Sequence, residues 1–96
     1  MGVTDDQVAK VRQATNIVVL IGERVALRRV GTRLVGRCPF HPEESPSFSV
    51  NPSEGLYYCF GCQTRGDVIT FVRETHNLDL EGSVRYLAAR VGIALD

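Results

Sequence analysis

Residues 38–62 read CPFHPEESPSFSVNPSEGLYYCFGC, and this stretch decides the fold. It contains two pairs of potential metal ligands, Cys38-x-x-His41 and Cys59-x-x-Cys62, separated by seventeen residues. Three thiols and one imidazole form a complete tetrahedral set for Zn²⁺, and a two-residue gap lets a tight turn direct both side chains at one ion. We expect one structural Zn²⁺, because four protein ligands leave no coordination position open for catalysis.

The composition favours one small globular domain over residues 1–96, with the zinc-ligand core at 38–62. The chain has 96 residues, of which 44% are hydrophobic and 23% are charged. Its three cysteines would leave one thiol unpaired in a disulfide framework, whereas zinc uses all three. We therefore expect a reducing compartment such as a bacterial cytoplasm. We expect no membrane contact, because the sequence has neither a run of about 20 apolar residues nor a signal-peptide pattern.

Charge is distributed unevenly along a chain whose formal net charge is zero. Residues 24–37 contain no Asp or Glu, and their arginines are Arg24, Arg28, Arg29, Arg33 and Arg37. Guanidinium groups pair with phosphates and stack on bases. The same pattern also fits a solvated face of a β-ribbon, and charge alone does not decide between these two interpretations.

Turn and alternation signals predict an antiparallel sheet around the ligand pairs. Residues 24–37 alternate between apolar and arginine positions on both sides of a Gly31-Thr32 turn, which predicts a hairpin leading into Cys38. Residues 47–50 and 56–60 alternate again, with a turn signal between them. Two further strands are therefore expected, so that both ligand pairs lie at strand ends.

Helices are expected on both sides of this sheet. A capping box at Thr4 predicts a first helix, while the apolar run at 17–23 fits either a short capped helix or a buried strand. Helical periodicity predicts two more helices at 68–76 and 80–90. The predicted fold is α+β, with a small antiparallel zinc ribbon flanked by short N-terminal and C-terminal helices.

Aromatic residues cluster beside the second ligand pair. Alternation places Tyr58 and Phe60 on one face of a strand and Tyr57 on the other. We expect Phe48 and Phe60 to pack in the core. Whichever of Tyr57 and Tyr58 is exposed is the candidate for stacking on a nucleic-acid base, because aromatic faces on a sheet bind single strands.

Residues 38–72 strongly resemble the N-terminal zinc-binding domain of bacterial (DnaG-type) DNA primase. The matching elements are CPFH at 38–41, SPSF at 45–48, YCFGC at 58–62 and GD at 66–67. The flanking segments at 16–31 and 80–95 resemble the lead-in and the closing helix of that family. The chain departs from the family pattern at Glu44, where a Lys is common, and at Gln63 and Arg65, where small residues are common.

The resemblance implies a role in reading a DNA template. In that family the domain engages single-stranded DNA and helps to choose where RNA primers start, acting with a separate RNA polymerase domain. It implies that the chain is part of a primase, a DNA-directed RNA polymerase acting at the bacterial replication fork, with the replicative helicase bound through regions absent here. The chain itself shows no catalytic residues. The expected nucleic-acid contacts are Arg28, Arg29, Arg33, Arg37, Arg65, Tyr57 and Tyr58.

Two other functions stay open from the residues themselves. A zinc ribbon that docks a polymerase or helicase domain is supported by the zero net charge and the acidic pair Glu43-Glu44. A free-standing enzyme has little support, because no nucleophile–base pair or carboxylate cluster is visible. We interpret His76 as an ordinary surface residue and Asp67 as a helix-start residue.

Overall fold

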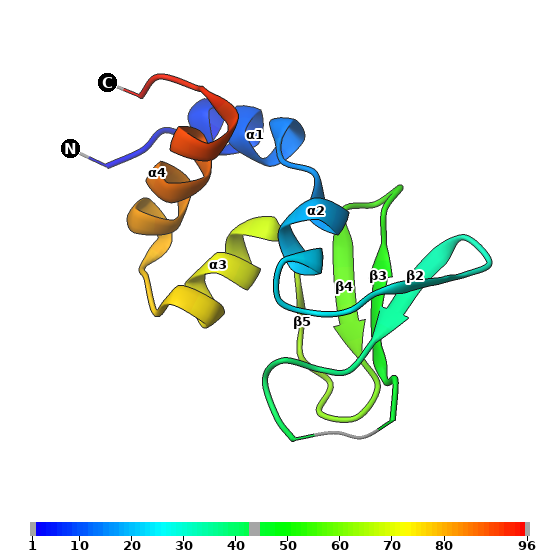
Figure 1. Ribbon diagram of the computed structural model, residues 1–96. Coiled ribbons are helices and arrows are strands. Elements are labelled where there is room, and N and C mark those ends of the chain that lie inside the picture. The colour runs from blue at the N-terminus through cyan, green and yellow to red at the C-terminus, as the bar shows by residue number, and fades with distance from the viewer. Residues whose placement is uncertain (1, 43–44, 96) are drawn as a thin grey trace. The chain divides into compact units, whose positions relative to one another are not determined.

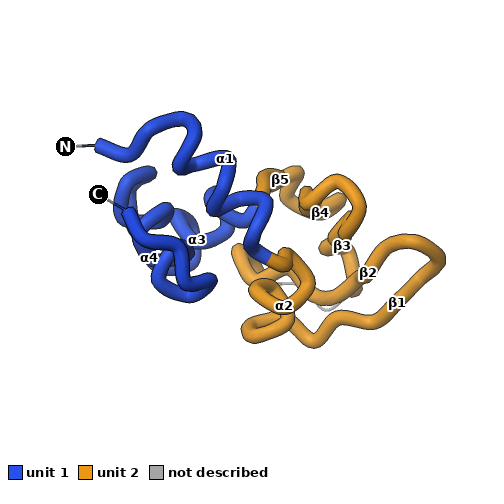
Figure 2. Tube along the Cα trace, turned by 90° about the horizontal axis from the view of Figure 1, so that it is seen from above, with its two compact units in different colours: residues 1–15, 68–96 blue, residues 16–67 orange. Residues whose placement is uncertain are grey.

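A computed structural model describes residues 2–42 and 45–95, and its helices and antiparallel sheet confirm the α+β class (Figure 1). The chain divides into two compact units (Figure 2). One is formed by the residues up to 15 together with those from 68 onward, and the other by residues 16–67.

The helical unit contains α1 (Asp5–Ala14), α3 (Val68–His76) and α4 (Leu80–Val91). Helix α4 contacts both α1 and α3. The predicted helices at 68–76 and 80–90 are thus confirmed, and the second of them is one residue longer than expected. The buried apolar side chains of this unit are Val11, Val68, Ile69, Phe71, Val72, Val84, Leu87 and Ala88.

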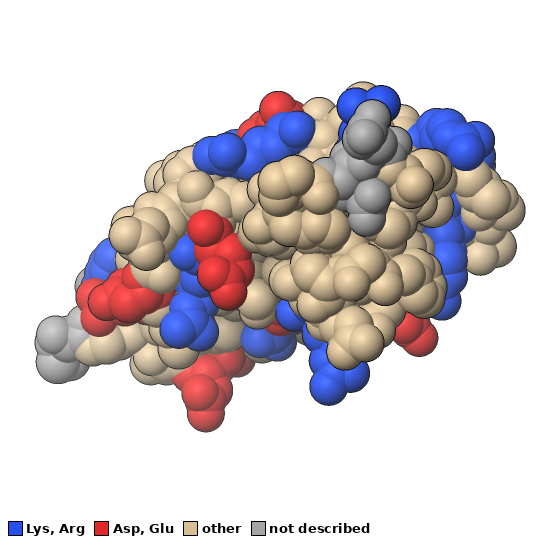
Figure 3. Space-filling model, turned by 90° about the horizontal axis from the view of Figure 1, so that it is seen from below, with Lys and Arg blue, Asp and Glu red and all other residues tan. Residues whose placement is uncertain are grey.

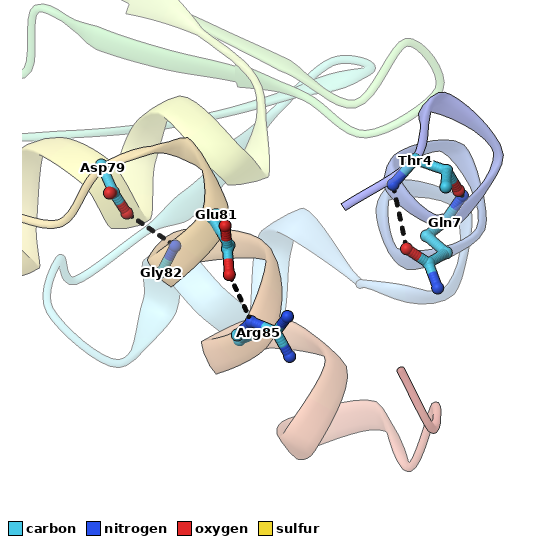
Figure 4. Close-up of polar contacts among 6 residues, drawn as sticks. All are labelled: Thr4, Gln7, Asp79, Glu81, Gly82 and Arg85. Atoms are coloured by element: carbon cyan, nitrogen blue, oxygen red, sulfur yellow. Dashed lines mark hydrogen bonds and ion pairs between the residues drawn. The ribbon is translucent and has the colours of Figure 1, made fainter. Parts of the chain in front are cut away.

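Side-chain caps fix where these helices begin (Figure 4). The capping box before α1 is present: Thr4 N–H donates to Gln7 Oε1 at 2.9 Å, and Gln7 N–H donates to Thr4 Oγ1 at 3.1 Å. Helix α4 begins after Asp79, whose carboxylate accepts from Gly82 N–H at 2.7 Å. Each cap satisfies a backbone donor that has no partner within its own helix.

The second unit consists of a short helix, α2 (Ile17–Gly22), and a five-stranded antiparallel sheet. The side chain of Asn16 accepts from two N–H groups in the first turn of α2, which selects the helix over the buried strand that the apolar run also allowed. The strands lie in sequence order and are β1 (Arg28–Val30), β2 (Arg33–Gly36), β3 (Phe48–Asn51), β4 (Leu56–Cys59) and β5 (Arg65–Gly66).

The sheet differs from the prediction at both edges. The first strand begins at Arg28 rather than at residue 24, because Arg24 and Val25 both donate backbone N–H bonds to Ile21 O at 2.9 Å and so extend the end of α2. The two-residue strand β5 was not predicted. It forms by pairing with β4, with Tyr58 opposite Arg65.

Strand register divides the sheet into an inner and an outer face. On the inner face Val50 lies opposite Leu34 and Tyr57, and Phe48 lies opposite Gly36 and Cys59. Phe48 and Val50 are fully buried, so the predicted packing role of Phe48 is confirmed. No helix within the described residues is long and apolar enough to cross a membrane.

Candidate metal centre and nucleic-acid surface

The four predicted metal ligands come from two connections of the sheet. Cys38 and His41 lie between β2 and β3, while Cys59 ends β4 and Cys62 follows it. Figure 1 shows the β2–β3 and β4–β5 connections at the same end of the sheet. Antiparallel pairing of β3 with β4 explains how residues about twenty positions apart come together.

The geometry of these four side chains fits one tetrahedral Zn²⁺. Their ligand atoms all lie within 4.8 Å of one another. The Cys38 and Cys62 Sγ atoms are 3.8 Å apart, and His41 Nε2 is 3.4 Å from Cys59 Sγ. Zinc bonds of normal length require about 3.8 Å between two sulfurs and about 3.6 Å between nitrogen and sulfur. The observed distances are close to both values, and the distance between the two sulfurs is far too long for a disulfide bond.

The imidazole of His41 is oriented for metal binding through Nε2. Its Nδ1 lies 3.1 Å from Pro42 O, so an N–H at Nδ1 donates to that carbonyl. This tautomer leaves the Nε2 lone pair directed at the cluster, as in most zinc sites where the second ring nitrogen is hydrogen-bonded.

Each cysteine sulfur also has a hydrogen-bonding neighbour outside the ligand set. The backbone N–H of Phe40 donates to Cys38 Sγ at 3.4 Å. The hydroxyl of Ser47 is 3.6 Å from Cys59 Sγ, and that of Thr64 is 3.1 Å from Cys62 Sγ. Such contacts stabilise thiolates, which are the form that binds zinc.

The protein environment shifts the proton affinity of three of the ligands. Burial raises the pKa of the Cys38 thiol to about 12. Burial acts in the same direction on Cys59, but hydrogen bonds from the Cys62 backbone and the His41 ring outweigh it and lower the pKa of Cys59 to about 6. The hydrogen bond with Cys59 in turn raises the pKa of His41 above its usual 6.5.

The ligand set is closed, which points to a structural role. Among the described residues, this is the one cluster of three or more side chains able to ligate a metal, and it contains no carboxylate. Cys38 and Cys59 are buried. His76 lies outside the cluster, and its ring contacts Tyr86 with 4.6 Å between ring centroids. The chemistry of these groups supports folding rather than catalysis.

The outer face of the sheet carries a row of side chains that crosses all five strands. The paired residues are, in order, Arg28, Val35, Ser49, Tyr58 and Arg65. Residues paired across neighbouring strands share a face, so arginines lie at both ends of this row and a tyrosine lies within it. Arg33 belongs to the same face because it precedes Val35 by two residues.

The other predicted arginines lie elsewhere. Arg29 lies on the inner face of the sheet, opposite Leu34. Arg37 follows β2 and lines a separate hollow of about 610 Å³ together with Arg24 and Arg28. All of these arginines are exposed, and none makes an ion pair within the described part of the chain. Figure 3 shows several separate groups of Lys and Arg side chains along the edges of the right-hand part of the view, with few Asp or Glu side chains beside them.

The two tyrosines separate clearly in the structure. Tyr57 is only 2% exposed, and its ring stacks on Phe48 at 5.3 Å, so its prediction as a nucleic-acid contact is corrected. Tyr58 on the outer face remains the stacking candidate. Phe60 was expected in the core but is 69% exposed, and its ring contacts Tyr58 edge-on at 4.9 Å. Cys59 points inward toward the cluster, so the next residue is directed outward.

Comparisons with known proteins agree with this geometry. The model of the family described as "CHC2 zinc finger" matches residues 3–96. A DNA primase of Clostridium acetobutylicum is 44% identical over 94 residues, which are 98% of this chain and 16% of that protein. A DNA primase of Streptomyces coelicolor is 46% identical over 94 residues, covering 97% of this chain and 15% of the relative.

A solved structure is similar as well. The crystal structure of the Aquifex aeolicus primase, containing zinc-binding and RNA polymerase domains, aligns with a TM-score of 0.88 and 38% identity. The match covers 94% of this chain and 22% of the other. The chain therefore spans about a sixth of the length of these two DNA primases.

Proposed function

The chain belongs to the CHC2 zinc finger family, and from that premise we propose that residues 1–96 form one zinc-binding domain of a DNA primase. In this proposal the domain binds single-stranded template DNA and helps to select the sites where RNA primers start. The family model spans both compact units, which supports treating them as one domain. One structural Zn²⁺, ligated by the Cys-His-Cys-Cys cluster, holds the connections at one end of the sheet.

The observation that carries the proposal is the outer face of the sheet. Three arginines on this face, Arg28, Arg33 and Arg65, have no ion pair within the described residues. Tyr58 lies among them. Cations that track a phosphate backbone and aromatic rings on which bases stack are the two components of single-strand binding surfaces. Arg65 also supplies a cation where relatives of the resembled family commonly have a small residue.

Fluorescence anisotropy with labelled single-stranded DNA tests the proposal. Arg33→Gln should weaken binding by the zinc-loaded chain, because one phosphate contact is lost. Arg73→Gln removes another exposed guanidinium, from α3 in the helical unit, and should leave the affinity unchanged. Absence of binding at low salt, or equal affinities for both variants and the parent, would contradict the proposal.

A protein-docking role is the second candidate, and exposed apolar side chains favour it. Leu56 is 46% and Phe60 is 69% exposed, and both belong to the outer side of β4 and its continuation. An apolar surface of this kind suits contact with a polymerase or helicase domain. If Arg28→Gln and Arg33→Gln leave DNA affinity unchanged but weaken docking to a primase polymerase domain, this function replaces the first.

The wider setting follows from the same premise. The partners we propose are the template strand, the RNA polymerase domain that carries the nucleotidyl-transfer chemistry, and the replicative helicase through regions outside this chain. The place of action is the replication fork in a bacterial cytoplasm. A chain carrying only the zinc-binding domain supplies no catalytic group of its own to primer synthesis.

A further inference from the structure

A hollow on the outer face of the sheet has the size of a small-ligand site. Its volume is about 560 Å³, and its walls include Arg33, Arg65, Tyr58, Glu54 and Ser49. All of these residues belong to the sheet unit. Pockets of this size bind small molecules or single side groups of polymers.

Ser49 contributes a hydroxyl that has no hydrogen-bond partner among the residues that the structure describes. The residue is 3% exposed, and its Oγ has no hydrogen bond within the described residues. Buried hydroxyls are nearly always paired in native proteins, because leaving one unpaired costs free energy. The Oγ atom itself is covered in this structure, so a ligand in the hollow reaches it only after the Ser49 side chain rotates about its Cα–Cβ bond.

Glu54 presents a carboxylate that is held in place by its own turn. The Nδ2 of Asn51 donates to Glu54 Oε1 at 3.2 Å, and Asn51 Oδ1 accepts from the N–H groups of Ser53 and Glu54 at 3.1 and 3.3 Å. The second carboxylate oxygen makes no hydrogen bond or ion pair within the described chain. The hollow thus has one pre-positioned acceptor.

The other side chains around the hollow suit the phosphate groups and the base of a nucleotide. Arg33 and Arg65 are both exposed and free of ion pairs in the described residues, which suits them to phosphates. Tyr58 lies directly opposite Ser49 on one strand and Arg65 on the other, so an aromatic ring separates the hydroxyl from a cation. An aromatic ring beside cations is the arrangement on which bases of a single strand stack.

We propose that this hollow binds one base of the template strand and selects a base with an exocyclic amino group, cytosine or adenine, over thymine. The proposal rests on the proposed function. Tyr58 stacks on the base, and Glu54 accepts a hydrogen bond from its amino group. Ser49, once its side chain has rotated toward the hollow, bonds to another polar atom of the base edge. Thymine has a carbonyl oxygen where cytosine has its amino group, so a carboxylate repels it. Glu54 is in this account a residue that determines sequence preference.

The test compares the zinc-loaded chain on labelled dC12, dA12 and dT12 at one salt concentration. The parent should bind dC12 and dA12 about five- to tenfold more tightly than dT12, the range expected for one good polar contact to a base. Glu54→Gln should reduce this ratio to about twofold, because an amide also donates to the thymine carbonyl. The loss of a negative charge in Glu54→Gln strengthens binding to every oligonucleotide alike. The ratio of the affinity for dC12 or dA12 to that for dT12 is therefore the quantity to compare.

Two further variants separate base reading from general effects. Ser49→Ala should lower affinity for dC12 about threefold without lowering the melting temperature, because the hydroxyl has no hydrogen bond to the described part of the free protein. Glu74→Gln changes an exposed carboxylate of α3 and should leave the ratio at the parent value.

The outcomes distinguish this inference from the function on which it rests. Equal affinity of the parent for all three oligonucleotides, or an unchanged ratio in Glu54→Gln, overturns the base-selecting hollow while the binding function stands. Absence of binding to any oligonucleotide overturns both. Binding of an acidic peptide in the hollow, with no effect of Ser49→Ala on DNA, would assign it to a protein partner instead.

Discussion

At the scale of single residues, Gln63 is the position where the metal-binding loop is under backbone strain. Its φ is 64°, in the left-handed region, and its N–H donates to Cys59 O at 2.8 Å. This conformation lets the chain turn immediately after Cys62. A residue other than glycine costs about 1–2 kcal/mol in the left-handed region of backbone conformation. The chain therefore retains this turn at the expense of stability.

Replacing Gln63 with glycine should therefore stabilise the protein. We expect the free energy of unfolding of the zinc-loaded chain to rise by about 1 kcal/mol, since relief of strain exceeds the greater flexibility of glycine in the unfolded chain. Denaturant unfolding measures this change. As a control, Gln13→Gly within helix α1 should lower stability by about 1 kcal/mol. A Gln63→Gly protein less stable than the parent would show that the side chain has a stabilising role that outweighs the strain.

The pH dependence of zinc affinity is a second consequence at this scale. Zinc binds Cys38 as a thiolate, and a pKa of about 12 means that a proton competes for this sulfur throughout the neutral range. The pKa of Cys59 is about 6, so its proton competes only near or below that pH. Affinity should rise by at least about tenfold per pH unit between about pH 6.5 and 8.5.

A competition titration against a chromophoric chelator measures this slope. The raised pKa of His41 adds to the loss of affinity at the acidic end, because its protonated ring cannot bind the metal. An affinity that stays constant over this range would contradict the ionisation pattern assigned to Cys38.

At the scale of secondary-structure elements, strand β2 must pass close to the chain that follows α2. A Cβ added to Gly36 would lie 2.7 Å from Ala26 O and 2.7 Å from Val25 Cγ1, which real Cβ atoms do not tolerate. Gly36 precedes Cys38 by two residues, so this close approach also sets the direction in which the chain enters the metal site.

We predict opposite effects for alanine at two glycines of the sheet unit. Gly36→Ala should lower the free energy of unfolding by about 1–3 kcal/mol, because either the backbone or Val25 must move. Gly22→Ala, at the end of α2, meets nothing within 4 Å and should raise it by up to about 1 kcal/mol. Thermal unfolding of both zinc-loaded variants makes the comparison. A neutral Gly36→Ala would mean that β2 shifts freely.

Local sequence signals predicted most elements but not the edges of the sheet. The cap at Thr4 and the helical periodicity of 68–76 and 80–90 involve only residues that are close together in the sequence. These elements can therefore be predicted without knowledge of the fold. The apolar run at 17–23 was ambiguous because its periodicity fits two structures, and a hydrogen-bonding side chain at Asn16 decides between them. The two residues of β5 carry no strand signal and become a strand only through pairing with β4.

At the scale of the whole molecule, DNA binding should show a salt dependence set by the outer-face arginines. Each phosphate neutralised on a single strand contributes about −0.7 to the slope of log K against log salt. The double variant Arg28→Gln/Arg33→Gln should therefore bind with a slope less steep by about 1.4. Anisotropy titrations at four or five salt concentrations give this value. An unchanged slope would show that these two arginines do not contact the phosphates of the bound strand.

The metal site was predictable from sequence, whereas the binding surface was only partly so. Ligand identity and spacing are local, and they specify Cys38, His41, Cys59 and Cys62 without reference to the fold. Alternation shows that Tyr57 and Tyr58 face opposite ways, but it does not say which face is buried. The hollow around Ser49 depends on the register of three strands, and no local pattern encodes that register.

The central claim is that one Zn²⁺ bound by these four side chains holds the sheet in its folded form. Far-ultraviolet circular dichroism before and after a strong chelator, followed by one equivalent of zinc, tests it most directly. We predict loss of the strand signal on chelation and its recovery at one zinc per chain. A spectrum and melting temperature that do not change when the metal is removed would contradict the claim.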